Sequence, residues 1–226
     1  NYRSPLAECC MVTIKGKKKL MNRQVDLTKC GLDYIREDDE QIEIGAMTSY
    51  RSVETCDILK KYFNGVIADS VSSIIGTQFR NTVTVGGSVY GRFGFSDFLT
   101  PLLALDTSVV LYKRGSISLE TFMTMPYEKE IIEKIGDQER RTEVSYPDVS
   151  QFQRGFPILN LAASRTEAGQ WIVTVGARGP KAIRAEKTAA FLSDKLSQNA
   201  LKAEDVEAVI QEAGEILVSE VDVLTR

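Results

Sequence analysis

The first third of the chain combines short strand patterns with helical ones. Residues 34–36 and 41–45 flank an acidic turn, and Ile42 and Ile44 alternate with polar neighbours, which predicts a β-hairpin. A short strand is expected upstream of this hairpin, at residues 24–27. These patterns predict at least one antiparallel strand pair near the start of the fold.

Two helices are expected after this hairpin. Thr48 and Ser49 are good N-terminal capping residues. The helix that they open carries its apolar side chains on one side, at Val53, Leu59, Tyr62 and Phe63. A second helix is expected at residues 66–75 and should end at Gly76, because glycine readily adopts the left-handed conformation that terminates a helix.

The middle of the chain is rich in glycine. Residues 83–85 are Val-Thr-Val, which predicts a strand, and the pair Gly86–Gly87 follows at once. A strand that leads into two glycines lets the backbone approach a ligand with consecutive N–H groups pointing inward, an arrangement that binds phosphates. Thr84 and Ser88 would add hydroxyl donors, and Asp97 could accept a hydrogen bond from the same ligand. By itself the pair is more common in turns and bulges, so both interpretations stay open at this point.

Further strand and helix patterns follow the glycines. A short helix is expected at residues 101–105, opened by Asp97 or Thr100. Residues 109–112 and 116–119 flank a Lys-Arg-Gly turn, which predicts a second hairpin. Three glutamates that could be mistaken for an acid–base cluster are interpreted as the solvated face of a helix: Glu128, Glu130 and Glu133.

The last third differs in composition, and the change falls between residues 136 and 141. Beyond it, residues 157–163 and 171–175 are expected to form two strands around a turn, and residues 186–196 and 203–218 two helices. Five apolar residues at helical spacing in the second helix are interpreted as core: Val206, Val209, Ile210, Ala213 and Leu217. Strands and helices are segregated here, which predicts a small α+β layer pair.

The composition narrows the function classes. The chain has 226 residues, of which 43% are hydrophobic and 26% charged, as is typical of a globular protein. The formal net charge is -3 with acids and bases interspersed, which argues against nucleic acid or an anionic membrane as partners. No apolar run approaches the roughly 20 residues of a membrane-spanning helix. The start, Asn1–Pro5, lacks the apolar segment of a signal peptide, so a cytoplasmic location is expected.

The side chains offer little chemistry of their own. Histidine is absent, which excludes Ser-His-Asp and Cys-His nucleophilic sites and histidine-based zinc or non-haem iron sites. The cysteines have no C-x-x-C spacing and are interpreted as reduced thiols: Cys9, Cys10, Cys30 and Cys56. No catalytic and no metal-binding residue is therefore assigned, and redox chemistry would need a bound organic cofactor.

A longer series of residues around the glycine pair is far more specific. Residues 75–88 read Ile-Gly-Thr-Gln-Phe-Arg-Asn-Thr-Val-Thr-Val-Gly-Gly-Ser, and residues 96–106 read Ser-Asp-Phe-Leu-Thr-Pro-Leu-Leu-Ala-Leu-Asp. The series continues through residues 127–132, 156–160 and 175–178 and so covers nearly the whole chain. It closely resembles the FAD-binding (medium) subunit of the molybdenum hydroxylases, the family of xanthine dehydrogenase and the carbon monoxide dehydrogenase flavoprotein subunit.

The resemblance implies an α+β fold in two parts. A PCMH-type FAD-binding domain would occupy residues 1–138, and a small α+β domain like the C-terminal domain of the carbon monoxide dehydrogenase flavoprotein would occupy residues 139–226. The implied partners are a molybdopterin-binding subunit and a 2Fe–2S subunit. Electrons would pass from the iron–sulfur clusters through FAD to NAD or another acceptor.

The resemblance also implies a cofactor site. The loop 84–88 would hold the FAD pyrophosphate, with Asp97 close to the cofactor. Ile74 occupies the position where the family packs a side chain on the adenine, and Ile131 or Ile132 would be its counterpart on the other face. The implied cofactor-binding residues are thus Ile74, Thr84, Val85, Gly86, Gly87, Ser88, Asp97 and Ile131. Arg80 could contact phosphate or form a structural ion pair, and both roles stay open.

The sequence departs from the family's pattern at three places. Ser88 replaces the usual asparagine, Gly155 stands where an aspartate is common, and residues 7–10 stand where the family has a second glycine-rich phosphate loop. An alternative function is a free-standing PCMH-type flavin reductase with its own substrate pocket. An enclosed pocket with convergent polar groups would favour this alternative, and a missing acid–base set beside the flavin would favour the subunit.

Overall fold

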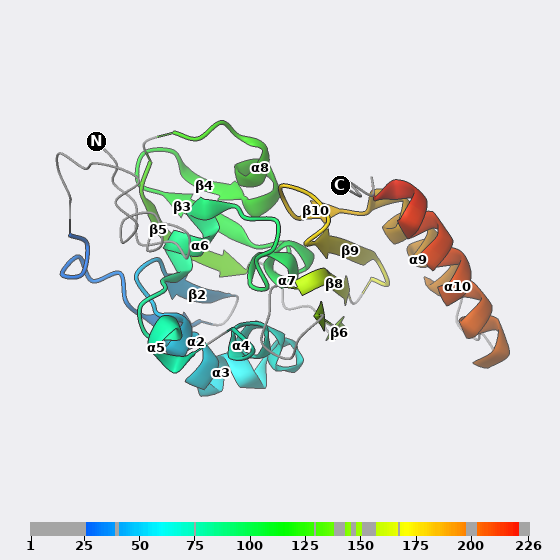
Figure 1. Ribbon diagram of the computed structural model, residues 1–226, viewed down its shortest axis with the longest axis horizontal. Coiled ribbons are helices and arrows are strands. Elements are labelled where there is room, and N and C mark those ends of the chain that lie inside the picture. The colour runs from blue at the N-terminus through cyan, green and yellow to red at the C-terminus, as the bar shows by residue number, and fades with distance from the viewer. Residues whose placement is uncertain are drawn as a thin grey trace.

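The computed structural model describes residues 26–38, 41–74, 76–128, 130–137, 143–145, 148–150, 157–166, 168–197 and 203–221. They form two antiparallel sheets with helices packed against them (Figure 1). Two long helices lie at one end of the molecule, where α9 (Glu186–Ser197) packs against the second sheet and α10 (Ala203–Glu220) packs against α9. The α+β class expected from the sequence is confirmed.

The first sheet has five strands in the order β1-β2-β5-β3-β4. They are β1 (Ile35–Glu37), β2 (Ile42–Gly45), β3 (Ser108–Leu111), β4 (Gly115–Ser118) and β5 (Ile132–Asp137). Both predicted hairpins are confirmed, since β1 pairs with β2 and β3 with β4. Ile42 and Ile44 are buried on one face, because alternate residues of a strand point to the same side. β5 joins the two hairpins by pairing with β2 and β3.

The segment after the first hairpin forms several short helices in place of the two expected. These are α2 (Tyr50–Thr55), α3 (Asp57–Lys61), the 3-10 helix η1 (Phe63–Gly65), α4 (Val66–Ser72) and α5 (Thr77–Arg80). Ser49 caps α2 as predicted, with its Oγ accepting the Ser52 amide at 3.0 Å. The first expected helix is interrupted because Cys56 is extended and Asn64 is left-handed, with φ 54°. The second expected helix ends at Ser72, earlier than Gly76.

Helix α7 (Leu99–Ala104) confirms the expected short helix and lies between the two sheets (Figure 1). It packs against α4 on one side and against the second sheet on the other. Its leucines are all buried, because neighbouring elements pack against the helix on more than one side: Leu99, Leu102 and Leu103. Two further helices, α6 (Val85–Gly91) and α8 (Leu119–Thr124), flank it in the sequence.

The second sheet has the order β10-β9-β8-β6, with β7 also paired to β8. Its strands are β6 (Glu143–Ser145), β7 (Asp148–Ser150), β8 (Pro157–Arg165), β9 (Trp171–Gly176) and β10 (Ile183–Arg184). The predicted strand pair is confirmed as β8 and β9, and the predicted helices as α9 and α10. Leu161, Ala163 and Val173 pack in the cluster that contains α9, whereas Ala162 and Thr174 are buried on the opposite face, toward α7.

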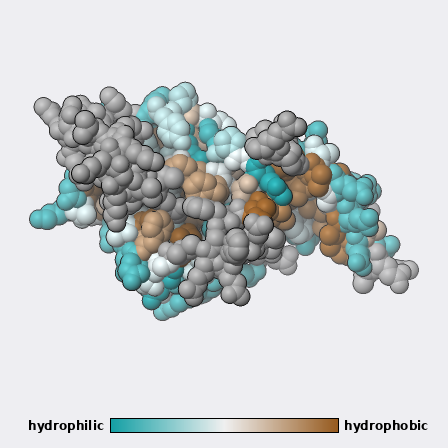
Figure 2. Space-filling model, in the orientation of Figure 1, coloured by the Kyte–Doolittle hydropathy of each residue, from teal (hydrophilic) through white to brown (hydrophobic). Residues whose placement is uncertain are grey.

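The apolar side of α10 is only partly covered. Val209 and Ala213 are buried, but Ile210 is 61% exposed, so its interpretation as core was wrong. Ile210 lies about 100° further round the helix than Val209, and α9 runs along one side of α10 only (Figure 1). Figure 2 accordingly shows hydrophobic residues along this helix pair beside a hydrophilic outer surface.

Two other expectations were wrong. Residues 26 and 27 are not in a strand, since the Asp26 carboxylate instead forms a turn by accepting the amide and hydroxyl of Thr28 at 2.9 and 2.7 Å. The three glutamates do not form a solvated helix face, because Glu133 belongs to β5 and Glu130 is buried. Several predicted positions lie outside the described residues: 7–10, 24–25, 75, 138–142 and 155.

Candidate functional site

The strand predicted at residues 83–85 was wrong, and the glycine pair lies in the first turn of α6. Thr84 is the N-cap of this helix. Its backbone is extended, and its Oγ1 accepts the Gly87 amide at 3.2 Å. Threonine favours both strands and helix N-caps, so the local pattern did not separate the two outcomes. The only strand-like pairing described for these residues is an isolated antiparallel bridge between Thr84 and Ser49.

Two main-chain hydrogen bonds hold the start of α6 against the segment that follows β2. The Val85 amide donates to the Thr48 carbonyl at 2.9 Å, and the Gly86 amide to the Ala46 carbonyl at 2.8 Å. A Cβ at Gly86 would lie 2.6 Å from the Ala46 Cβ and 2.9 Å from its carbonyl oxygen. Packing alone therefore requires glycine at position 86.

The next two residues carry polar groups that suit an anionic ligand. The Gly87 amide is bonded to a side-chain hydroxyl, which can rotate away. Ser88 is only 3% exposed, and within the described part of the chain its Oγ has no hydrogen-bond partner. A buried hydroxyl without a partner destabilises a fold by about 1–3 kcal/mol. A phosphate oxygen of FAD is a suitable acceptor, so these residues fit the cofactor that the resemblance implies.

Asp97 lies half-buried in the loop before α7, and its carboxylate is tied to the second sheet. Its Oδ1 accepts the Asn160 side-chain amide at 3.0 Å, across 63 positions of sequence. Asn160 is fully buried on β8. Asn160 was not among the residues predicted from the sequence. The available signal was the row of polar and small residues at alternate positions of this strand, namely Asn160, Ala162 and Ser164.

The two predicted isoleucines lie on other elements. Ile74 is half-buried just after α4 and packs against the main core. Ile131 is half-buried just before β5, and its carbonyl accepts the Tyr112 amide at 2.9 Å. Ile132 is buried in the core, so Ile131 is the one of this pair that keeps surface for a ligand. Because β5 packs against α6, Ile131 precedes a strand that neighbours the glycine helix.

Arg80 forms a structural ion pair, which decides between its two open roles. Its Nε and Nη2 donate to the two carboxylate oxygens of Glu54 at 2.8 and 3.1 Å. Burial acts to raise the pKa of Glu54, but hydrogen bonds from Arg80 and Arg51 outweigh it and hold that pKa below its ordinary value. The guanidinium also donates to the Ile74 carbonyl. Arg80 thus fixes the segment that carries Ile74.

The C-terminal end of α6 is anchored by Arg92, a residue that was not predicted from the sequence. Its backbone is left-handed, with φ 50°, and its guanidinium lies 4.0 Å from the ring centroid of Phe122 and 4.7 Å from that of Tyr127. Burial lowers the pKa of Arg92. The Tyr127 hydroxyl donates to the Gly91 carbonyl at 2.8 Å. Both ends of α6 are therefore held by contacts distant in sequence.

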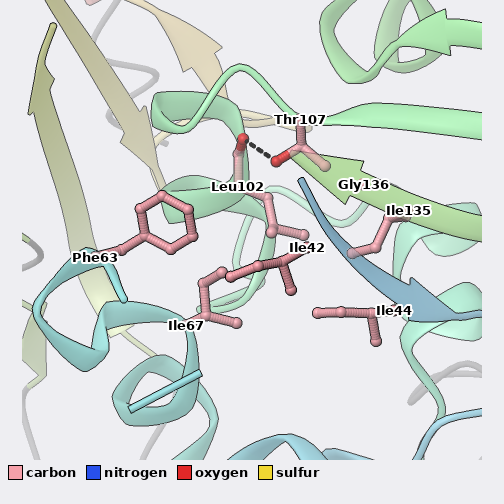
Figure 3. Close-up of a pocket in the computed structure, with 8 residues that line it drawn as sticks. All are labelled: Ile42, Ile44, Phe63, Ile67, Leu102, Thr107, Ile135 and Gly136. Carbon is pink, nitrogen blue, oxygen red and sulfur yellow. Dashed lines mark hydrogen bonds between the residues drawn. The ribbon is translucent and has the colours of Figure 1, made fainter. Parts of the chain in front are cut away.

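A small cavity lies in the core between the first sheet and its helices (Figure 3). Its volume is about 10 Å³, roughly one water molecule, and ligand pockets are typically larger than about 300 Å³. Thr107, the one hydroxyl residue in its lining, donates to the Leu102 carbonyl at 2.8 Å. The lining residues are Ile42, Ile44, Phe63, Ile67, Leu102, Thr107, Ile135 and Gly136. This cavity does not provide the pocket with convergent polar groups that a free-standing reductase would need.

The described ranges contain neither a candidate membrane span nor a candidate metal site. No helix there is both long and apolar enough to cross a membrane. In the same residues, no group of three or more His, Cys, Asp or Glu side chains could hold a metal ion. Cys30 and Cys56 are free thiols.

Solved structures share this fold. A chain of carbon monoxide dehydrogenase from Hydrogenophaga pseudoflava, lacking the Mo-pyranopterin moiety of the molybdenum cofactor, matches with a TM-score of 0.81 at 20% identity. A chain of quinoline 2-oxidoreductase from Pseudomonas putida 86 matches with a TM-score of 0.83 at 15% identity. Each match covers 99% of this chain and 81% of the other. At these identities the likeness establishes the fold.

Sequence comparison establishes the family. The uncharacterized protein YgfM of Escherichia coli strain K12 is 23% identical over 160 residues, which are 71% of this chain and 60% of that protein. The match thus spans less than two thirds of that relative's length. Residues 7–136 match the family described as the FAD binding domain in molybdopterin dehydrogenase, a range that contains every predicted cofactor-binding residue. The chain therefore belongs to this family of FAD-binding domains.

Proposed function

We propose that this chain is the FAD-binding subunit of a molybdopterin-dependent dehydrogenase or hydroxylase of the xanthine dehydrogenase type. Bound FAD would take electrons from iron–sulfur clusters of a 2Fe–2S partner subunit and pass them to NAD or another acceptor. Hydroxylation would take place on a molybdopterin-binding partner subunit. The absence of histidine from the sequence fits a chain that leaves this chemistry to its partners.

In this proposal the FAD pyrophosphate lies at the first turn of α6, along residues 84–88. The buried Ser88 hydroxyl, without a partner among the described residues, is the observation that supports this most directly. The Gly87 amide would be the second donor, released when the Thr84 hydroxyl turns from it to a phosphate oxygen. The Val85 and Gly86 amides already donate to the Thr48 and Ala46 carbonyls. These two residues would therefore lie beside the pyrophosphate without donating a hydrogen bond to it.

The remaining predicted residues would orient the rest of the cofactor. Asp97 would accept a hydrogen bond from the ribose or from a flavin N–H group. Ile74 would pack on the adenine, and Ile131 on the opposite face. All three are half-buried, which leaves each of them surface for such a contact.

Two wider features belong to the same proposal. Residues 1–138 would be the FAD-binding domain and residues 139–226 the second domain, which is supported by the end of the family match at residue 136 and by strand pairing within each sheet. The complex would work in the cytoplasm, in keeping with the free thiols at Cys30 and Cys56.

The pyrophosphate site is tested by titrating the apo chain and its variants with FAD. Ser88→Ala should weaken FAD binding about tenfold, the loss of one hydrogen bond to a charged group. It should not lower apo stability, because the hydroxyl that it removes is buried without a described partner. Ser70→Ala is the matched control. Ser70 is also buried, but its hydroxyl donates to the Ile67 carbonyl at 2.9 Å, so this change should lower apo stability and leave FAD affinity unchanged.

Gly87→Val gives a second measurement, because it places a branched side chain where the phosphate would approach. The variant should lose most of its flavin. A folded Gly87→Val protein with full FAD content would refute the site assignment.

The subunit role is tested separately, by isolating the tagged chain from its native cells and assaying the purified material for FAD, molybdenum, iron and partner subunits. Isolation of the chain alone with FAD and its own reductase activity would favour the free-standing reductase.

A further inference from the structure

The second sheet presents a row of polar and small side chains to α7. Three of them make hydrogen bonds across this interface. The Ser164 hydroxyl donates to the Ala104 carbonyl, the Thr174 hydroxyl donates to the Thr100 carbonyl at 2.9 Å, and Asn160 donates to Asp97. The first two bind main-chain oxygens of a helix. Asn160 alone among these three binds a side chain, and that side chain is a proposed cofactor ligand.

The surroundings of Asn160 leave its amide little freedom. It is paired in register with Gly176 on β9, and a Cβ at Gly176 would lie 3.0 Å from the Asn160 Oδ1 and 2.4 Å from the Thr100 Oγ1. Asn160 is fully buried, so its side chain has one packed environment. A donor held this firmly restrains the position of the carboxylate oxygen that it binds, and so limits how the Asp97 carboxylate can turn.

We propose that Asn160 is a positioning residue for FAD, acting through Asp97 from the second sheet. This inference rests on the proposed function, in which Asp97 accepts a hydrogen bond from the cofactor. By holding one oxygen of Asp97 at 3.0 Å, Asn160 restricts the orientations in which that carboxylate can meet the cofactor. The second sheet then contributes to flavin binding through Asp97, because a side chain that is already held in its binding orientation loses less entropy when the cofactor binds.

The test measures FAD dissociation constants and the visible circular dichroism of the bound flavin. Asn160→Asp keeps the shape of the side chain but replaces the donor with a carboxylate that repels Asp97. Asn160→Ala removes the donor and serves if the aspartate variant does not fold. Ser164→Ala is the matched control, because it removes a buried hydrogen bond from the same face of β8 to α7 without touching Asp97.

Both Asn160 variants should weaken FAD binding about tenfold and alter the flavin dichroism. Ser164→Ala should lower only the stability of the apo protein. In an Asp97→Ala background, Asn160→Ala should cause no further loss of FAD affinity, because the effect of Asn160 passes through Asp97.

Three results would overturn this role. They are wild-type FAD affinity in a folded Asn160→Asp protein, an equal loss of affinity in Ser164→Ala, and additive losses in the double variant. Failure of the wild-type chain itself to bind FAD would be a different outcome. It would refute the proposed function, and the role of Asn160 with it.

Discussion

At the residue scale, the glycines of this chain serve opposite purposes. Gly86 lies where the first turn of α6 meets Ala46, and any side chain would have to displace that backbone. Gly214 lies in the middle of α10, is exposed, and would bring an added Cβ near nothing within 4 Å. Glycine inside a helix is unfavourable in itself, because it loses the most backbone entropy on folding. Gly86 is therefore required by packing, whereas Gly214 only weakens its helix.

These two positions make a matched pair for a stability measurement. Gly86→Ala should lower the free energy of unfolding of the apo protein by about 1–3 kcal/mol, since an overpacked site must shift its neighbours. Gly214→Ala should raise it by about 0.5–1 kcal/mol. Urea unfolding followed by circular dichroism measures both. A Gly86→Ala protein as stable as wild type would show that α6 can move away from Ala46.

At the element scale, α9 begins with a cap supplied by another helix. The carboxylate of Glu220, the last residue of α10, accepts the Lys187 and Thr188 amides at 2.8 and 3.0 Å. It also accepts the Thr188 hydroxyl at 3.0 Å. The first amides of a helix have no partner within the helix, and a negative charge there is favourable. Burial acts to raise the pKa of Glu220, but the bonds from Lys187 and Thr188 outweigh it, so that pKa lies below its ordinary value.

This lowered pKa predicts a dependence on pH. A carboxylate with a depressed folded-state pKa contributes stability above its unfolded pKa of about 4.3, and that contribution is lost as the pH falls through the folded value. Glu220→Gln should therefore destabilise the α9–α10 pair by about 1 kcal/mol at pH 7 and should have little effect once the carboxylate is protonated. Hydrogen exchange at the Lys187 and Thr188 amides measures the change. Glu215→Gln, at an exposed position of α10, is the control and should leave their protection unchanged.

The elements also differ in how far local pattern predicted them. The hairpins and the β8–β9 pair followed from alternation within a few residues, and α9 and α10 from helical spacing. Helix α6 did not, because Val-Thr-Val favours a strand by propensity. The Thr84 cap and the contact of Gly86 with Ala46 override that preference, and the second of these joins residues far apart in the sequence.

At the scale of the whole molecule, the described residues join the two sheets through α7 and through several other contacts, one of which is a close contact between loops. The Gly94 amide donates to the Pro180 carbonyl at 3.1 Å, and the Gly94 carbonyl accepts the Ala177 amide at 2.6 Å. A Cβ at Gly94 would lie 2.1 Å from the Gly179 carbonyl oxygen. Asp97 follows in the same loop, so the contact that joins the sheets also places a proposed cofactor residue.

Gly94→Ala should therefore weaken the connection between the two sheets. We expect the wild-type chain to unfold in one thermal transition and the variant in two, the first with a lower midpoint, because main chain on both sides of the contact must move. Gly179→Ala is the control from the facing loop. An added Cβ there would lie 3.7 Å from the Lys181 carbonyl oxygen, an ordinary contact, so its transition should match wild type. Scanning calorimetry distinguishes these outcomes, and one unshifted transition for Gly94→Ala would contradict this account.

The candidate site was predictable only in part. The residue series around the glycine pair was enough to indicate the family, and the family match over residues 7–136 agrees with it. The same series could not separate residues required by packing from those available to a ligand. Gly86 belongs to the first group, and Ser88 has the buried hydroxyl expected of the second.

Local order along the chain was sufficient for the two hairpins, the β8–β9 pair, the Ser49 cap and the residue series that indicates the family. Each of these depends on residues close together in the sequence. The bond between Asn160 and Asp97, the ion pair of Arg80 with Glu54, and the fit of Gly86 against Ala46 depended on the folded chain. Each of them joins segments that meet only after the sheets and helices have packed. The strength of each of these contacts depends on how deeply its groups are buried and on the distance between them. Neither quantity can be read from the order of residues along the chain.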